Sequence, residues 1–159
     1  MSYQAVILTV SDSCAAGTRT DTSGPAIRAM LENAGFAVQA MQTVPDEEGQ
    51  ISAAIVHDCD ILQADLVVTT GGTGLSARDV TPEATLAVLD REIRAIPVAM
   101  WVEGLKSTPR AMLSRAVAGT RGHTLVLNVP GSEKAARENL GAVVATLDHA
   151  LRMLAGGGH

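Results

Sequence analysis

Aromatic side chains are almost missing from this 159-residue chain, which contains one Phe, one Tyr and one Trp. Proteins that bind single-stranded nucleic acid stack bases on aromatic rings, and this chain has few to offer. Positive charge is scarce too, because 12 Lys and Arg stand against 17 Asp and Glu and the formal net charge is −5. An acidic chain repels polyanions and anionic membranes. We therefore expect neither nucleic acid nor a membrane as a partner.

Cysteine and targeting signals are also scarce. The two cysteines, Cys14 and Cys59, share no metal-ligand spacing, and we expect Cys59 to be a buried structural thiol. No secretory signal, lipidation motif or transmembrane run is recognised in the sequence. These absences predict a cytoplasmic protein.

Aliphatic residues are abundant instead. Hydrophobic residues make up 47% of the chain, so the core must consist of Ala, Val, Leu, Ile and Met. The length predicts one domain over residues 1–159, with residues 155–159 as a frayed tail. A mean hydropathy of +0.20 indicates more apolar surface than a monomer of this size easily buries, which favours self-association. The apolar segment from Pro97 to Ala118 is the candidate for subunit contacts.

Strand and helix patterns alternate along the chain without a repeat or a linker. Apolar, β-branched runs predict strands at Gln4–Val10, Phe36–Val44, Asp65–Thr70 and Thr124–Val129. A polar, flexible stretch is expected between Ala15 and Thr22. Helical spacing predicts helices from Ser23 to a stop at Gly35, and over Glu47–Leu62, Pro82–Leu89, Pro97–Leu105, Arg110–Ala118 and Glu133–Leu154. The pattern predicts an α/β fold of three layers, with a largely parallel sheet and helices on both faces.

A glycine-rich turn follows the third predicted strand and is the most informative segment. Gly71–Gly74 leaves backbone that a phosphate can approach, although the turn is neither a Walker A loop nor a dinucleotide fingerprint. Arg78 and Asp79 follow, as a phosphate-pairing cation and a possible metal ligand. Thr81-Pro82 then predicts a helix with Thr81 as its N-cap.

Each of the four predicted strands ends in polar or glycine-rich residues. Ligands of parallel α/β sheets collect at the carboxyl ends of the strands, so these four ends predict one pocket. The four ends are Ser11-Asp12-Ser13, Pro45-Asp46-Glu47, Gly71-Gly72-Thr73-Gly74 and Asn128-Val129-Pro130-Gly131-Ser132.

Positive charge is concentrated in one part of the chain. The region from Arg78 to Arg137 holds nine of the twelve basic residues and six acidic ones. This local excess of positive charge suits a small anionic ligand, and it is equally explained by charged helix faces that are exposed to solvent.

Asp46 and Asp79 come from two different strand ends and form the candidate metal site. Together they could hold one Mg²⁺ that also bridges substrate phosphates, because Mg²⁺ commonly takes one or two protein carboxylates. The alternative is that each carboxylate caps the helix that begins just after it. No elbow motif or His–Cys pair predicts covalent catalysis, and the histidines are expected to face solvent.

Five segments together resemble the MogA/MoaB family of molybdenum-cofactor biosynthesis, which includes gephyrin-type G domains. The similarity runs in order from Ala5 to Leu154, and the Asp79–Glu83 segment is closer to the adenylyltransferase branch than to the MoaB branch. The segments are Thr9-Val10-Ser11-Asp12, Val44-Pro45-Asp46-Glu47, Gly71-Gly72-Thr73-Gly74 continuing to Arg78-Asp79-Val80-Thr81-Pro82-Glu83-Ala84-Thr85, Met112-Leu113-Ser114-Arg115 and Asn128-Val129-Pro130-Gly131.

The resemblance implies an Mg²⁺-dependent molybdopterin adenylyltransferase that uses ATP as co-substrate and releases pyrophosphate. It implies a homotrimer that passes its product to a molybdate-inserting, MoeA-like partner. Asp46 and Asp79 would be the catalytic, metal-associated carboxylates, and Gly71, Gly72 and Gly74 would shape the phosphate loop. Thr73, Ser114 and Asn128 would contact the pterin, and the expected substrate contacts also include Ser11, Asp12, Arg78, Pro130, Gly131 and Ser132.

Two other functions remain open from the sequence. One is a non-catalytic, MoaB-type protein that binds or scaffolds the pterin. The other is a different nucleotide-processing enzyme, since related domains occur in competence/damage-inducible proteins. The Thr81-Pro82-Glu83 continuation and the Asn128–Gly131 loop argue against the second.

Overall fold

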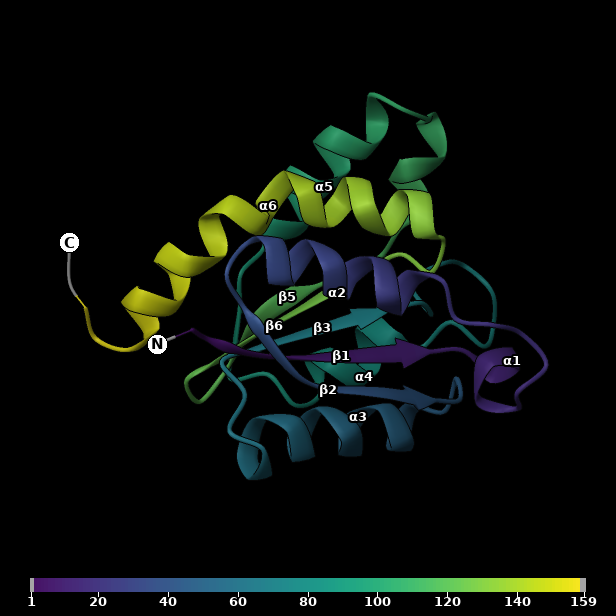
Figure 1. The fold of residues 1–159 in the computed structure, drawn as a ribbon. Helices are drawn as coiled ribbons and strands as arrows, with labels where there is room; N and C mark the ends of the chain where they lie inside the picture. The colour runs from purple at the N-terminus through teal and green to yellow at the C-terminus, as the bar shows by residue number, and fades with distance from the viewer. Residues whose placement is uncertain (1, 158–159) are drawn as a thin grey trace.

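The computed structural model describes residues 2–157 and contains one six-stranded sheet (Figure 1). The strand order is β2-β1-β3-β6-β5-β4. The first four strands in that order run parallel, whereas β5 and β4 are antiparallel to their neighbours. The strands are β1 (Gln4–Val10), β2 (Ala37–Val44), β3 (Leu66–Thr70), β4 (Arg91–Glu92), β5 (Ala118–Arg121) and β6 (Thr124–Val129).

Helices cover both faces of the sheet, as predicted. In Figure 1, α2, α5 and α6 lie on one side of the strands and α3 lies on the other, with α4 on the side of α3. The helices are α1 (Asp12–Ala15), α2 (Ser23–Asn33), α3 (Glu48–Val56) with the π-helical turn η1 (His57–Ile61), α4 (Thr81–Leu86), α5 (Ala95–Leu105), the 3₁₀ turn η2 (Pro109–Leu113) and α6 (Glu133–Leu154).

Alternation along the strands divides the core into two layers. On β1, Ile7 packs into the cluster under α2, α5 and α6, and its neighbour Leu8 packs into the cluster over α3 and α4. Successive side chains of a strand point to opposite faces, so a strand covered on both sides must be apolar throughout. The nearly continuous apolar runs of β1, β3 and β6 meet this requirement, and the predicted three-layer fold is confirmed.

The antiparallel edge of the sheet was not predicted. The segment predicted as a helix over Arg110–Ala118 is a 3₁₀ turn that ends at Leu113 and is followed by extended chain leading into β5. Thr108 caps that turn, because its Oγ1 accepts a hydrogen bond from the Arg110 N–H. Ala118–Arg121 shows no apolar alternation of its own, and it becomes a strand because its backbone pairs with β6.

The chain ends and helix boundaries show smaller differences. The short helix α1 was not predicted, and α4 ends at Leu86 rather than Leu89. The Gly156 and Gly157 N–H groups bond back to the last turn of α6, whereas residues 158–159 of the expected frayed tail lie outside the described residues. Within residues 2–157, no helix combines the length and the apolar character needed to cross a bilayer.

The register of the parallel strands brings their carboxyl ends to one edge of the sheet. Val10 of β1 pairs with Val44 of β2, and Thr70 of β3 pairs with Val129 of β6. Thr9 of β1 is the partner of Thr70, so all four strands end at the same level. The four polar strand ends predicted from the sequence therefore lie together.

Candidate active site

A cavity of about 640 Å³ opens at this edge of the sheet. Its walls come from the ends of β1, β3 and β6, from the segment before α2, and from the α5–η2 region. Volumes of this size are usual for small-molecule sites. The predicted site residues that line it are Ser11, Asp46, Gly71, Gly72, Thr73, Gly74, Asp79, Ser114, Pro130, Gly131 and Ser132.

Two glycines that line the cavity are required by the packing of the protein itself. Gly71 and Gly72 adopt φ values of +101° and +68°, which L side chains rarely adopt. A Cβ on Gly71 would lie 2.2 Å from the Val10 carbonyl oxygen, and one on Gly72 would lie 2.2 Å from the Thr81 Oγ1. The turn is therefore glycine-rich because it passes closely over β1 and α4, in addition to any approach by a phosphate.

Thr81 does not cap α4 as the sequence predicted. The helix begins at Thr81 itself, and Val80 occupies the N-cap position. The Thr81 N–H donates to the Gly72 carbonyl oxygen at 3.1 Å, and its buried Oγ1 has no hydrogen-bond partner among the described residues. Thr81 therefore packs the glycine turn against the helix.

Arg115 holds the glycine loop from the outside. Its Nε donates to the Gly74 carbonyl oxygen at 2.8 Å and its Nη2 donates to the Asp79 carbonyl oxygen at 2.7 Å, while its Nη1 pairs with Glu83 on α4. One planar guanidinium thus binds both ends of the loop and the helix that follows. The sequence had included Arg115 only within the Met112–Arg115 segment of the family resemblance.

Asp46 and Asp79 lie against two glycines of the same loop. Asp46 Oδ1 lies 3.1 Å from the position that a Cβ on Gly72 would occupy, and Asp79 Oδ2 lies 2.9 Å from the equivalent position on Gly74. Burial raises the pKa of Asp46, and the negative charges of Asp12 and Asp79 raise it further. Both carboxylates therefore lie against the same glycine loop.

Neither carboxylate caps the helix that follows it, so that alternative is wrong. The N-caps of α3 and α4 make no side-chain cap hydrogen bond. Asp46 Oδ2 instead accepts from the Asp12 N–H at 2.9 Å, and Asp79 Oδ2 accepts from the Ser76 N–H at 3.0 Å inside the loop.

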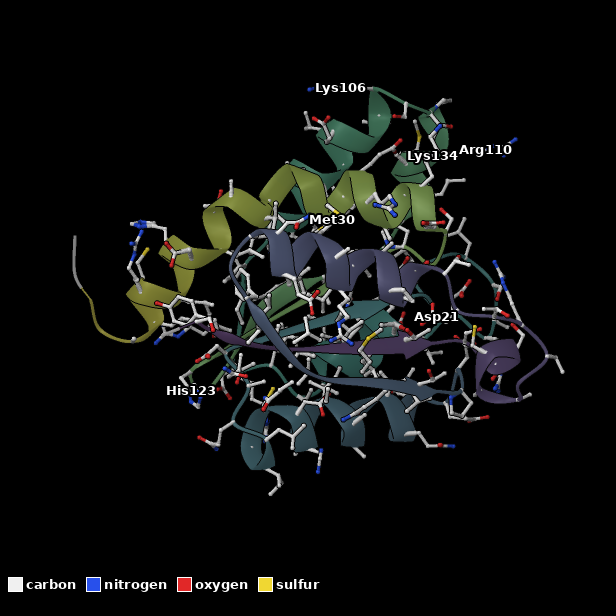
Figure 2. The ribbon with its side chains drawn as sticks, in the orientation of Figure 1. Asp21, Met30, Lys106, Arg110, His123 and Lys134 are labelled. Carbon is white, nitrogen blue, oxygen red and sulfur yellow. The ribbon has the colours of Figure 1, made fainter. Side chains whose placement is uncertain are left out.

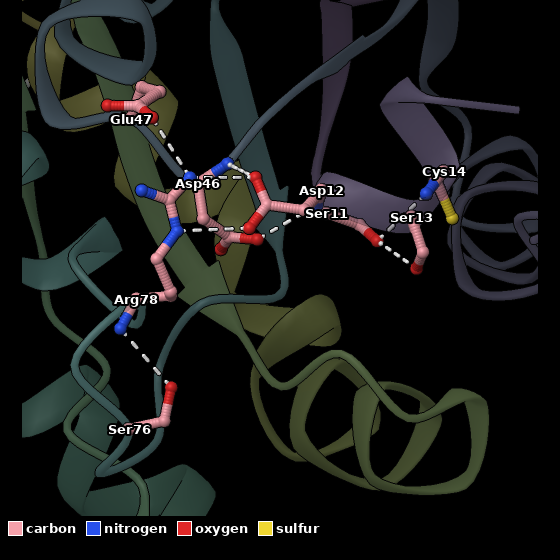
Figure 3. A network of polar contacts seen from close by, with 8 residues as sticks. All are labelled: Ser11, Asp12, Ser13, Cys14, Asp46, Glu47, Ser76 and Arg78. Atoms are coloured by element: carbon pink, nitrogen blue, oxygen red, sulfur yellow. Dashed lines mark hydrogen bonds and ion pairs between the residues drawn. The ribbon is translucent and has the colours of Figure 1, made fainter. Parts of the chain in front are cut away.

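Asp12 and Arg78 are not among the residues that line the cavity, and they bind each other in a polar network (Figure 3). The Arg78 guanidinium donates to both carboxylate oxygens of Asp12, at 3.1 and 2.9 Å, and to Glu47 Oε1 at 2.9 Å. The hydrogen bonds from Arg78 hold the pKa of Asp12 below its usual range. In this structure the predicted phosphate-pairing cation is bound to two carboxylates.

Asn128 is also placed outside the cavity. Its side chain is fully buried, its Oδ1 accepts from the Val117 N–H at 3.1 Å, and its Nδ2 donates to the hydroxyls of Thr69 and Thr85. These bonds join β6 to β3, to α4 and to the chain before β5, so the Asn128 side chain has a structural role in this protein. Its expected contact with the pterin stays a prediction.

The sequence missed one wall of the cavity. Most of it comes from the polar segment before α2, where Asp21 accepts from the Thr9 hydroxyl at 2.8 Å and from the Gly24 N–H at 3.0 Å. Figure 2 shows Asp21 beside the end of β1. The polar composition of that stretch had predicted only that it is flexible. The missed lining residues include Arg19, Thr20, Asp21, Thr22, Ser23, Arg110, Glu138 and Asn139.

A three-layer α/β domain with an open cavity at the carboxyl edge of its sheet belongs to the class that binds small ligands at that edge. The family model described as "Probable molybdopterin binding domain" matches residues 6–149. The chain belongs to this MogA/MoaB family.

The similar proteins come from both branches of the family. The chain is 37% identical over 154 residues to "Molybdopterin adenylyltransferase" of Helicobacter pylori, covering 94% of this chain and 86% of that protein. It is 49% identical to the solved structure of the molybdopterin biosynthesis enzyme MoaB from Thermus thermophilus, with a TM-score of 0.92 and 97% of each chain covered.

Larger proteins also contain a domain of this kind. The chain is 40% identical to "Gephyrin" of Dictyostelium discoideum over 158 residues, which is 93% of this chain and 22% of that protein. The chain covers 25% and 49% of the length of two further relatives, whose names refer to molybdenum cofactor synthesis. The similarity therefore covers one domain of these longer proteins.

Proposed function

We propose that this protein is an Mg²⁺-dependent molybdopterin adenylyltransferase of molybdenum cofactor biosynthesis, which transfers AMP from ATP to the molybdopterin phosphate. The observation that carries the proposal is the pair of carboxylates, Asp46 and Asp79, which face one glycine loop at the wall of a cavity of about 640 Å³. Relatives that are named molybdopterin adenylyltransferase match most of the chain and support it.

The donor set fits Mg²⁺. Asp46 and Asp79 supply two hard carboxylate groups, and the described residues contain no group of three or more His, Cys, Asp or Glu side chains that could hold a metal. Mg²⁺ commonly binds through one or two carboxylates and completes its shell with water and substrate phosphates. When bound, the ion would neutralise phosphate charge as the transferred group changes partner.

The reaction needs the two reacting phosphates to be aligned, and it does not need a strong base. An oxygen of the molybdopterin phosphate forms a bond to the α-phosphorus of ATP, the bond from that phosphorus to the bridging oxygen breaks, and pyrophosphate leaves. The attacking oxygen is already anionic, so the protein's task is to position the two phosphates and neutralise charge. The hydroxyls of Thr73 and Ser114 and the glycine-loop backbone line the cavity and would hold the substrates.

The backbone of the β6 end is held in place for this task. The Ser23 hydroxyl donates to the Gly131 carbonyl oxygen at 2.6 Å, and the Thr70 hydroxyl donates to the Pro130 carbonyl oxygen at 2.7 Å. The Ser132 Oγ caps α6 by accepting from the Ala135 N–H. These bonds keep the loop rigid on the wall that would face the pterin.

A homotrimer, a cytoplasmic location and product transfer to a MoeA-like, molybdate-inserting protein complete the proposal. Exposed apolar side chains on α5 and η2 support self-association, among them Val98, Val102 and Met112. The cytoplasm supplies the ATP that the reaction needs.

The second candidate function is pterin binding without turnover, which the sequence leaves open for a chain similar to MoaB proteins. The deciding experiment incubates the pure protein with molybdopterin, Mg²⁺ and ATP, and measures adenylylated molybdopterin and pyrophosphate. Product formation at a rate that depends on Mg²⁺ is expected. Pterin binding without either product would establish the non-catalytic function.

A further inference from the structure

Arg78 connects three loops that are far apart in the sequence (Figure 3). Its guanidinium makes two hydrogen bonds to Asp12, at the end of β1, and one to Glu47, between β2 and α3. Its own backbone belongs to the glycine loop, where the Arg78 N–H donates to Ser76 Oγ at 3.3 Å. A single side chain therefore joins three of the strand ends at the cavity edge.

Asp12 and Asp46 are bound to each other in both directions. The Asp12 N–H donates to Asp46 Oδ2 at 2.9 Å, and the Asp46 N–H donates to Asp12 Oδ1 at 2.9 Å. Asp12 Oδ1 also accepts from Arg78. The position of the Asp46 carboxylate thus depends on Asp12, and the position of Asp12 depends on Arg78.

Arg78 is also covalently joined to the other candidate metal ligand, because Asp79 is the next residue. Asp12, Asp46, Glu47 and Asp79 concentrate negative charge in this region, because hydrogen bonds join the first three to Arg78 directly or through Asp12, and Asp79 follows Arg78 in the chain. Repulsion between like charges favours separation of the loops that carry them. The guanidinium fork opposes that separation at two of the carboxylates.

We propose that Arg78 is a positioning residue that sets the separation of the Asp46 and Asp79 carboxylates for a divalent cation, and that it does not contact the substrate phosphate. The inference rests on the proposed function for the identity of the cation site. Arg78 acts on Asp46 through Asp12 and on Asp79 through the shared loop backbone. Because about half of the Arg78 side chain is exposed, its effect lies in geometry more than in stability.

Geometry and charge alone predict opposite results when Arg78 is replaced. Loss of a positive charge near carboxylates would tighten binding of a cation if charge were the whole effect. Loss of a positioning residue weakens it, and outer partners of metal ligands commonly contribute about 10- to 100-fold in metal affinity. Arg78→Lys keeps the charge but cannot make the same planar fork, so it separates the two effects further.

The test titrates Mn²⁺ into the protein, alone and with a non-hydrolysable ATP analogue, and follows free Mn²⁺ by electron paramagnetic resonance. Arg78→Ala and Arg78→Lys are expected to weaken Mn²⁺ binding by at least about 10-fold. Arg28→Ala is the matched control, because Arg28 forms a similarly exposed ion pair with Glu32 away from the cavity. Circular dichroism checks that each variant is folded. If Arg78→Ala does not fold, Arg78→Lys alone tests the proposal.

Tighter or unchanged Mn²⁺ binding in folded Arg78 variants would overturn the proposal, as would wild-type protein that binds no Mn²⁺ in either titration. In the adenylylation assay, the Arg78 variants should need more Mg²⁺ for half-maximal rate at an unchanged KM for molybdopterin. A raised KM that saturating Mg²⁺ does not restore would make Arg78 a substrate contact. A further outcome is that the wild type forms no product while the Arg78 variants still bind Mn²⁺ more weakly than the wild type does. That result would support the positioning role of Arg78 and contradict the proposed activity.

Discussion

Asp79 is the residue on which the proposed chemistry depends most directly. Its Oδ2 accepts one hydrogen bond from the Ser76 N–H, and the side chain lies on the cavity wall. An amide has the same shape and keeps an oxygen acceptor, but it lacks the charge that a metal requires. The position therefore allows charge to be removed with little change in structure.

Asp79→Asn is expected to abolish adenylyl transfer and leave pterin binding largely intact. Loss of one electrostatic contact commonly lowers the rate by about 10²–10³, and loss of a metal ligand lowers it more. Turnover at saturating Mg²⁺, set beside a molybdopterin titration, measures both effects. Near-normal turnover would remove Asp79 from the mechanism, and a folding defect would assign it to the Ser76 turn.

Ser114→Ala is expected to weaken molybdopterin binding more than ATP binding. Ser114 lies on the cavity wall, and its Oγ has only a 3.4 Å contact with the Ala116 N–H inside the protein. Loss of a hydrogen bond to a charged ligand group costs roughly 1.5–3 kcal/mol, or about 10- to 150-fold in affinity. Separate titrations of the two ligands measure it, and an equal loss for both would show that Ser114 does not face the pterin.

At the scale of elements, the connection from β3 to α4 carries the site and is held by Arg115. The Arg115 N–H also donates to the Thr73 carbonyl oxygen at 2.8 Å, so both its backbone and its side chain bind the loop. Loops between a strand and a helix need such bonds because their backbone groups have no regular partners.

Arg115→Lys is expected to lower the stability of this loop although the charge is kept. A lysine has one ammonium in place of the fork that binds Gly74, Asp79 and Glu83, and each lost bond costs about 1–3 kcal/mol. Hydrogen exchange of the loop amides should quicken while that of β1 is unchanged. Equal protection in variant and wild type would show that the glycine turn holds its shape without Arg115.

The π-helical turn η1 carries a buried carboxylate away from the cavity. Asp58 is fully buried, its Oδ1 accepts from Gln42 Nε2 at 2.9 Å and lies 3.4 Å from His57 Nδ1, and its Oδ2 has no partner among the described residues. Burial raises the pKa of Asp58 above its ordinary value of 3.8. Compared with the unfolded chain, the folded protein therefore favours the protonated form of Asp58.

The raised pKa of Asp58 predicts a pH-dependent cost to stability. Its favourable contribution is complete below pH 3.8 and is lost as the pH rises through the higher folded-state pKa. The wild type should therefore lose stability relative to Asp58→Asn as the pH rises from about 4 to 7. Urea unfolding across this range measures the difference, and a constant difference would contradict the prediction.

Asp60→Asn provides a neighbouring control of opposite sign. Hydrogen bonds from Arg121 hold the pKa of Asp60 below 3.8, so its contribution is present above that pH and is lost as the pH falls. The wild type should gain stability relative to Asp60→Asn as the pH rises toward 3.8 from below the lowered pKa of Asp60.

For the whole molecule, the surface over α5 and η2 is the candidate subunit interface. Val98, Val102, Leu105, Met112 and Leu113 are 44–64% exposed. Met100 belongs to the buried core instead, although its sequence position suggested the same surface. Exposed apolar residues gathered in this way usually mark an interaction site.

The protein is expected to be a homotrimer in solution. Association would bury the apolar residues of α5 and η2, and the number three comes from the family resemblance. Light scattering at low micromolar concentration gives the mass, and a single species of 16.4 kDa would defeat the prediction. A dimer would agree with the association expected from the exposed apolar residues, and it would contradict the number of subunits expected from the family resemblance. Val102→Asp should lower the mass, because a charge would then lie on the expected interface.

Local chemistry in the sequence determined the four parallel strands and the position of the glycine turn. β-branched apolar runs bury both faces of a strand, and glycines mark the turn that leaves β3, so both features can be recognised without knowledge of distant residues. The placement of Asp46 and Asp79 at one edge was predicted in the same way, because parallel strands share one carboxyl edge.

Only the tertiary structure decided what depends on contacts between distant residues. β5 is a strand because β6 pairs with it, and Asn128 is buried because Thr69 and Thr85 lie beside it. Arg78 binds Asp12, 66 residues away in the sequence, rather than pointing into the cavity. Side chains of this kind have several possible partners of similar energy, and packing of the complete chain selects among them.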